Sequence, residues 1–250
     1  MAAEKPVNPW VRVFLPFAAG YYLSYLLRTV NAVIAPELTR ELTLTAADLG
    51  LLTSAYLLAF AAFQIPLGLL LDRYGPRRVE AGLLLVAAAG TLLFAIGRSP
   101  FELTVARGLI GLGVSSCLMA AFKGFAQNFP AERQASLTGA IMASGGLGAL
   151  TASLPLEFAL PLLGWRGVFQ GLTFLLLAVA ALIFFSVPQR EAGVSRDSLG
   201  AQLKDVGGIL AHRVFWRFAP PMTLVTGGFL AVQGLWAVPW LMNVDGLTRH

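Results

Sequence analysis

A stripe of polar side chains runs along one face of the first apolar stretch, and one of these side chains is charged. The residues at helical positions i, i+3, i+4, i+7 and i+10 are Tyr21, Ser24, Tyr25, Arg28 and Asn31. Residues at these spacings lie on one side of an α-helix. A guanidinium presents a planar fork of donors that fits a carboxylate or a phosphate. The stripe is therefore the candidate binding face for an anionic solute.

Arg28 lies deep in a stretch that is long enough to cross a bilayer. It stands ~14 residues into an apolar run that starts at Val13, which places its Cα ~21 Å along a helix and past the midplane. A charge at that depth is costly and usually faces a cavity or a partner. Arg28 therefore either contacts a solute or forms an ion pair with an acid in another part of the protein.

The second apolar stretch adds further polar side chains. Thr53, Tyr56 and Gln64 fall at i, i+3 and i+11 of a helix and are placed to line the same cavity. Phe60 and Phe63 lie near that face, so helix packing is an equally good interpretation. Carboxylates are expected only near the ends of the apolar stretches, with Glu80 at the inner edge of its span.

The chain lacks the residue groups that catalysis needs. It has two His residues, a single cysteine inside an apolar stretch, and no nucleophile and base at usable spacing. It also has no glycine loop of the kind that cradles a phosphate. One cysteine builds neither a disulfide framework nor a metal site. We therefore expect no enzyme activity, no metal and no cofactor.

Composition indicates a polytopic membrane protein. Hydrophobic residues make up 57% of the 250 residues and charged residues 12%, whereas a soluble domain carries roughly 25% charge. The net charge of +5 comes from basic residues scattered over short loops. Binding along a nucleic-acid backbone would need them on one face, so we expect no nucleic-acid partner. The partners expected are the lipid bilayer and a small solute.

Apolar runs of ~17 to 25 residues predict an all-α protein with seven transmembrane helices. The predicted spans are 13–35, 49–71, 79–97, 103–122, 135–156, 168–187 and 218–242. The chain then divides into an amino terminus (1–12), a six-helix transmembrane bundle (13–187), a linker (188–217), and a seventh helix with the carboxyl terminus (218–250). Leu199, Leu203, Val206 and Leu210 form one helical stripe in the linker, which favours an amphipathic interfacial helix. A solvated linker is the alternative.

Lysine and arginine lie mostly on one side of this arrangement. Short loops rich in these residues stay in the cytoplasm. Their distribution predicts a cytoplasmic amino terminus and a carboxyl terminus on the outer side of a plasma membrane, the inner membrane in a bacterium.

A weak internal repeat links spans two and three to spans five and six. Shifting the chain by 89 residues superposes one set of residues on another: Pro66, Leu67, Gly75, Arg77 and Val79 on Pro155, Leu156, Gly164, Arg166 and Val168. The first copy turns inside and the second outside. This pattern predicts two inverted triplets of helices.

The stretch GLLLDRYGPRR resembles a signature of the major facilitator superfamily. The matching residues are Gly68, Asp72, Arg73, Gly75, Arg77 and Arg78. The resemblance implies a gating role for them, with Asp72 meeting a helix of a second bundle. RGLIGLG, from Arg107 to Gly113, resembles a second and looser signature. It implies a role in coupling or in helix packing for Arg107, which we expect near the outer interface. Close helix contacts are expected at the glycines of the fourth and fifth spans, which are Gly108, Gly111, Gly113, Gly139, Gly145, Gly146 and Gly148.

The resemblance implies a secondary transporter that works by alternating access. Arg28 resembles the first-helix arginine of organophosphate antiporters and anion symporters in that superfamily, so the expected solute is a small organic anion. Members typically have twelve helices, so the sequence predicts a truncated or partial chain, or self-association if the chain is complete. The alternatives are a non-transporting membrane sensor or inactive fragment of the same fold, and a drug exporter.

Overall fold

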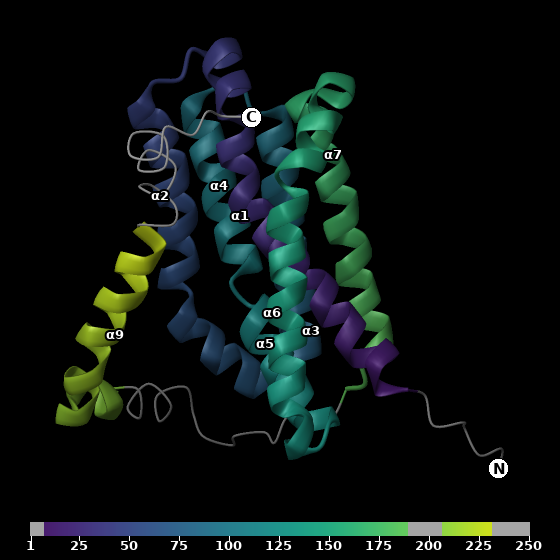
Figure 1. Cartoon of the computed structure of the whole chain (residues 1–250), viewed down its shortest axis with the longest axis vertical. Helices are drawn as coiled ribbons and strands as arrows, with labels where there is room; N and C mark the ends of the chain where they lie inside the picture. Colours follow the sequence, from purple (N-terminus) through teal and green to yellow (C-terminus); the bar gives the residue numbers. More distant parts are fainter. Residues whose placement is uncertain (1–7, 190–206, 232–250) are drawn as a thin grey trace, which may run out of the picture. The chain divides into compact units, whose positions relative to one another are not determined.

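A computed structural model describes residues 8–189 and 207–231 of the chain. Every regular element in that part is helical (Figure 1), which confirms the all-α fold. The chain divides into two units, Met1–Ser195 and Arg196–His250. The elements of the first unit are a π-helical turn at Trp10–Phe14, α1 (Leu15–Leu42), α2 (Ala46–Ala62), α3 (Gln64–Ile96), α4 (Pro100–Val114), α5 (Cys117–Asn128), a 3-10 turn at Ala131–Arg133, α6 (Gln134–Thr151) and α7 (Leu154–Ser186).

The second unit contains α9 (Arg213–Ala231), the described part of the seventh predicted span. This helix starts earlier than the apolar pattern suggested and includes Pro220 and Pro221. Of the stripe predicted in the linker, Leu199, Leu203 and Val206 lie outside the described residues, while residues 207–211 are helical.

Three helices of the described chain are long and apolar enough to cross a membrane. They are Gln64–Ile96, Pro100–Asn128 and Pro155–Ser186, and Ala46–Ala62 is a shorter apolar helix. The predicted spans do not map one to one onto helices, because α3 and α7 each join the end of one span to the whole of the next. Helix α1 also runs on beyond the predicted end at Ala35, through Pro36 to Leu42.

Two glycines make the sharp turns within α3 and α7. Gly75 has φ 77° and ψ 163°, and Gly164 has φ 65° and ψ 167°. This region of backbone space is open essentially to glycine alone. The two glycines are the pair related by the 89-residue shift, and they adopt the same conformation.

Two prolines interrupt the helices at equivalent positions before these turns. A proline lacks the N–H that would bond the carbonyl four residues earlier. Helix α2 ends at Ala62, four residues before Pro66, and α6 ends at Thr151, four residues before Pro155. The residues that follow, Phe63 and Ala152, have nearly equal torsions, with ψ of −6° at both. The repeat read from the sequence is thus present in the backbone.

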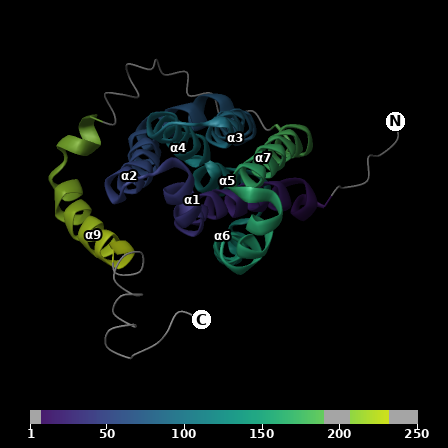
Figure 2. The same ribbon diagram turned by 90° about the horizontal axis from the view of Figure 1, so that it is seen from above.

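Helix α1 lies in the interior of the first unit (Figure 2), where it packs against α4, α5, α6 and α7. Its buried side chains include Phe17, Leu27, Val30 and Ile34. Helix α3 packs against α4 and α7, and α2 packs against α4. Polar groups on its packed side, such as Ser24 and Asn31, are therefore buried among other helices, whereas Tyr25 and Arg28 are half-buried.

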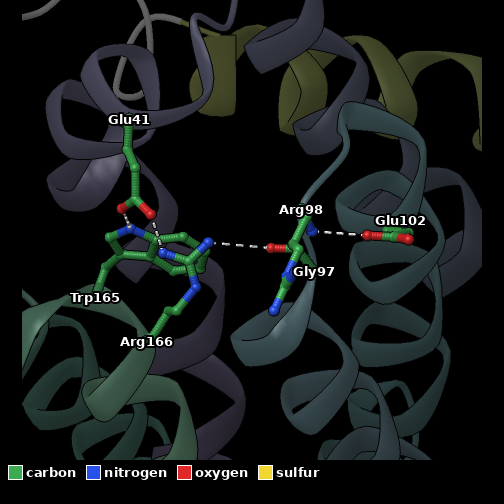
Figure 3. Close-up of polar contacts among 6 residues, drawn as sticks. All are labelled: Glu41, Gly97, Arg98, Glu102, Trp165 and Arg166. Atoms are coloured by element: carbon green, nitrogen blue, oxygen red, sulfur yellow. Dashed lines mark hydrogen bonds and ion pairs between the residues drawn. The ribbon is translucent and has the colours of Figure 1, made fainter.

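A cluster that we call the Glu41 clamp joins three segments at one end of this unit (Figure 3). The Trp165 indole donates to Glu41 Oε2 at 2.6 Å, and Arg166 forms an ion pair with the same carboxylate. Arg166 Nη2 also donates to the Gly97 carbonyl at 3.3 Å. The hydrogen bond from Trp165 has the largest effect on Glu41 and the one from Arg166 the next largest. Together they hold the pKa of the Glu41 carboxyl below its ordinary value of 4.5. The clamp ties the end of α1 to the turn of α7 and to the loop after α3.

The lowered pKa of Glu41 predicts a pH-dependent stability. Its contribution is complete above the ordinary pKa and disappears as the pH falls through the lower folded-state pKa. In thermal unfolding of the detergent-solubilised chain, Glu41→Gln should lower Tm at pH 7, and the difference from wild type should shrink towards about pH 3. Glu132→Gln, an exposed carboxylate outside the clamp, is the control. A constant difference across this pH range would contradict the assignment.

Some of the glycines predicted to bring helices together do so. A Cβ at Gly111 would overlap the Tyr56 carbonyl oxygen, and one at Gly148 would overlap that of Tyr22. The prediction is wrong for Gly108, Gly139 and Gly146, where an added Cβ meets nothing within 4 Å. These three face away from the neighbouring helices, which the spacing of glycines alone does not reveal.

Gly111 and Gly108 form a matched pair on α4. Gly111→Ala should destabilise the protein by about 1–3 kcal/mol, because the backbone of α2 has to move away. Gly108→Ala should be neutral or slightly stabilising, since alanine favours the helix and the space is open. Thermal or denaturant unfolding of the two variants measures the difference. Equal stabilities would show that α4 and α2 are not in close contact.

Candidate functional site

Arg28 lies on α1 between aromatic rings. Its guanidinium carbon is 4.9 Å from the centroid of the Tyr25 ring and 5.2 Å from that of Phe60 on α2. Its Nε is buried and has no hydrogen-bond partner. The ion pairs of the described residues are Arg40–Glu37, Lys123–Asp72 and Arg166–Glu41, so Arg28 pairs with none of the described acids.

Arg107 is buried beside the same helix, with 1% of its surface exposed. Its Nη1 donates to the Leu27 carbonyl at 2.9 Å, and its guanidinium carbon lies 4.5 Å from the centroid of the Tyr56 ring. Arg107 was expected to extend its side chain towards the outer interface, but the side chain is buried and turns inward. Helix α4 packs between α2 and α3, and the guanidinium reaches a carbonyl of α1.

Tyr56 connects the two arginines. Its hydroxyl is buried and makes no hydrogen bond of good geometry, although the guanidinium of Arg28 lies close enough to interact with it. On the same side Asn31 donates weakly to Thr53 Oγ1 at 3.4 Å, while its Oδ1 is buried without a partner. We call Arg28, Arg107, Tyr56 and Asn31 the arginine cluster. It combines two positive charges with a free hydroxyl donor and a free amide acceptor.

The other predicted stripe residues have packing roles. The Tyr21 hydroxyl contacts Met142 Sδ at 3.5 Å, and its ring packs edge-on against Tyr25. Ser24 is buried. Gln64 Nε2 donates to the carbonyls of Phe60 and Ser115 at 3.3 and 3.4 Å, so it caps backbone at two helix breaks. The periodicity identified the polar face and placed Tyr56 beside it, but it did not show that Arg107 joins this face from α4.

Glu80 is a buried carboxyl that the sequence placed at the edge of a span. It is 0% exposed, and its oxygens make no hydrogen bond of good geometry, although the buried Cys117 thiol lies close enough to interact with the carboxyl. Gly20 of α1 and Ile183 of α7 lie against it, and a Cβ at Gly20 would overlap Oε1. The turn at Gly75 sends the chain straight back into the bundle, so Glu80 enters the interior within two helical turns.

The residues of the GLLLDRYGPRR motif surround that turn. Asp72 forms an ion pair with Lys123 of α5, so within this chain the acid is bound to its own bundle. Arg73 lies 5.6 Å from the Tyr74 ring centroid, and Arg77 lies 4.8 Å from that of Phe184. Gly68 and Arg78 are exposed. The motif therefore contacts α5 and α7 through Asp72 and Arg77.

Two substitutions distinguish what the ring of Tyr56 and its hydroxyl each contribute to stability. Tyr56→Phe should leave the free energy of unfolding unchanged or slightly raised, because a buried hydroxyl without a partner is costly. Tyr56→Leu should destabilise by about 2 kcal/mol or more, since it removes the ring beneath the Arg107 guanidinium. Denaturant unfolding in detergent measures both. A loss of the same size in Tyr56→Phe would mean that the hydroxyl is bonded.

The helix repeat, together with two arginines on the interior side of α1 and α4 that pair with no described acid, defines a helical membrane bundle of the kind that builds solute transporters. The chain belongs to the Major Facilitator Superfamily, whose family model matches residues 17–248. Members of this family are transporters and not enzymes, which confirms the expectation that the chain is not an enzyme.

Individual relatives are transporters of small anions by name. The chain is 28% identical over 221 residues to a hexuronate transporter of Escherichia coli K12, which covers 82% of this chain and 51% of that protein. It is 28% identical over 182 residues to a probable sulfoacetate transporter of Cupriavidus necator, covering 72% of the chain and 42% of that protein. A galacturonate transporter of Dickeya chrysanthemi is 26% identical over 224 residues, with 82% and 64% covered. The chain spans about half the length of these relatives.

Proposed function

We propose that this chain supplies the anion-binding bundle of a secondary transporter for small organic acids. The observation that carries the proposal is that the buried Arg107 and the half-buried Arg28, whose Nε is buried, form no ion pair with an acid among the described residues. Positive charge without a counter-ion is costly in a medium of low dielectric constant, and an anionic ligand compensates it. The named solutes of the relatives, hexuronate, galacturonate and sulfoacetate, are all anions.

The arginine cluster provides a set of contacts suited to a hydroxy acid. Arg28 offers a planar fork to a carboxylate, and its Nε is already free. The Tyr56 hydroxyl is a further donor for the same carboxylate, and Asn31 Oδ1 is an acceptor for a hydroxyl of the solute. Arg107 is held by the Leu27 carbonyl, so it contributes charge and holds Tyr56 in place.

Transport by this bundle is proposed to follow the alternating-access scheme of inverted-repeat transporters, with the solute near the midplane. We also propose that the amino terminus is cytoplasmic, since Arg73, Arg77, Arg78 and Lys123 gather at the end of the bundle where the chain begins. The end that carries the Glu41 clamp then faces outward. We also keep as part of the proposal the predicted division of the chain into an amino terminus (1–12), a six-helix bundle (13–187), a linker (188–217) and a seventh helix with the carboxyl terminus (218–250).

Solute binding by the purified chain tests the role of Arg28. Galacturonate should bind saturably to the protein in detergent or nanodiscs, and its neutral counterpart galactose should not. Arg28→Gln should weaken the binding about tenfold to a hundredfold, the range of charge-assisted hydrogen bonds. Arg28→Lys should recover only part of the loss, because an ammonium lacks the planar fork. Equilibrium dialysis with labelled solute measures each dissociation constant.

Arg98→Gln is the matched control, because Arg98 is exposed and stands outside the cluster. It should bind galacturonate as the wild type does. Thermal unfolding of each variant shows that it is folded before binding is compared. Wild-type affinity in folded Arg28→Gln, or equal binding of galactose, would refute the anion site.

A further inference from the structure

A groove of about 360 Å³ lies between α3 and α7, away from the arginine cluster. Its lining comes from one stripe of each helix: Arg78, Ala81, Gly82 and Leu85 on α3, and Leu177, Ala180, Ala181, Phe184 and Phe185 on α7. The α3 residues stand at i, i+3, i+4 and i+7, and the α7 residues stand at i, i+3, i+4, i+7 and i+8, so each set forms one helical face. The floor of the groove consists of small residues, and a Cβ at Gly82 would meet nothing within 4 Å.

The walls of the groove are apolar and face outward. Leu85 is 53% exposed and Phe185 is 80% exposed. In a protein that lies in a membrane, exposed apolar side chains on a spanning helix contact lipid chains. The groove is thus open to the hydrocarbon of the bilayer along its length.

Its one charged lining residue, Arg78, lies in the first turn after Gly75, at the end of the spanning segment. Arg78 is exposed and takes part in none of the ion pairs of the described chain. The neighbouring Arg77 stacks on Phe184 of the groove wall, and its Nε is buried without a hydrogen-bond partner. Two guanidinium groups therefore stand at one end of an apolar channel, a charge pattern that complements a phospholipid with an anionic headgroup.

The size of the groove favours a lipid chain over a helix. Arg78 and Leu85 are separated by ~10 Å of helix rise. A volume of 360 Å³ over that length corresponds to a cross-section of ~36 Å², or ~6 Å across. A helix with its side chains is ~10–12 Å in diameter and does not fit. A single hydrocarbon chain does.

We propose that the groove between α3 and α7 binds an anionic phospholipid, with one acyl chain along Gly82 and Ala181 and the phosphate at Arg78 and Arg77. This site is separate from the proposed solute site and does not depend on transport. Phe184, held by Arg77, closes one side at the headgroup end. The lipid completes the apolar surface between the two helices that carry the glycine turns.

Native mass spectrometry of the delipidated chain in detergent tests the proposal. Phosphatidylglycerol should bind as a discrete first adduct, several-fold more tightly than phosphatidylcholine with the same acyl chains. Gly82→Leu fills the groove, and Arg78→Gln removes the phosphate contact. Each should weaken the first phosphatidylglycerol adduct about fivefold or more, in line with the attraction of one arginine for an anionic lipid.

Two controls separate the groove from the general lipid-facing surface. Gly171→Leu makes the same change at an exposed site on α7 outside the groove, where an added Cβ also meets nothing within 4 Å. Arg133→Gln removes an exposed arginine near α6. Both should bind phosphatidylglycerol as the wild type does. Arg78→Gln keeps the test decisive if Gly82→Leu does not fold.

Equal binding of the two lipids by the wild type would overturn the proposal. So would unchanged phosphatidylglycerol binding in both groove variants, or an equal loss in the two controls. A dimer that forms in place of the lipid adduct and is lost in Gly82→Leu would identify a second copy of the chain as the occupant, and would equally refute the lipid.

Discussion

A positive charge inside an apolar bundle has to be stabilised by the atoms around it, and this requirement governs the interior of the first unit. Arg107 is stabilised by the Leu27 carbonyl and the face of the Tyr56 ring, which belong to α1 and α2. One side chain of α4 thereby fixes two neighbouring helices at the same level. Arg28 follows Leu27 directly in α1, so the contact that satisfies one arginine also sets the position of the other.

The helix breaks near this level need the same kind of compensation. Pro66 ends α2 early, and α4 stops at Val114, so carbonyls of both segments lie free within the bundle. Gln64 donates to the Phe60 and Ser115 carbonyls and so joins the two breaks. Irregular backbone is tolerated at membrane depth only where protein groups satisfy it. The side chain that the periodicity suggested for solute contact is thus engaged by backbone, and Arg28 and Tyr56 retain free polar atoms.

The amino-acid pattern predicted the internal repeat, because Gly75 and Gly164 need a conformation that glycine alone adopts freely. It did not predict that α2 and α6 end before Pro66 and Pro155, because the apolar spans continue through both prolines. The pattern did not predict burial, because burial depends on the partner helix. Arg107 and Glu80 both stand near span ends in the sequence, yet both side chains are buried. The Leu27 carbonyl of α1 accepts a hydrogen bond from Arg107, and Gly20 of α1 leaves the space that the Glu80 carboxyl occupies. The same limit applies to Gly108, whose open surroundings depend on its neighbours.

The interior also holds a carboxyl group, Glu80, that forms no ion pair with the arginines. Glu80 lies beside Gly20, eight residues before Arg28 on α1, which corresponds to ~12 Å along the helix. Two unit charges at that distance interact by about 1.4 kcal/mol at an effective dielectric constant of about 20. A negative charge on Glu80 would therefore oppose the anion that we propose for the arginine cluster, whereas a neutral Glu80 would not.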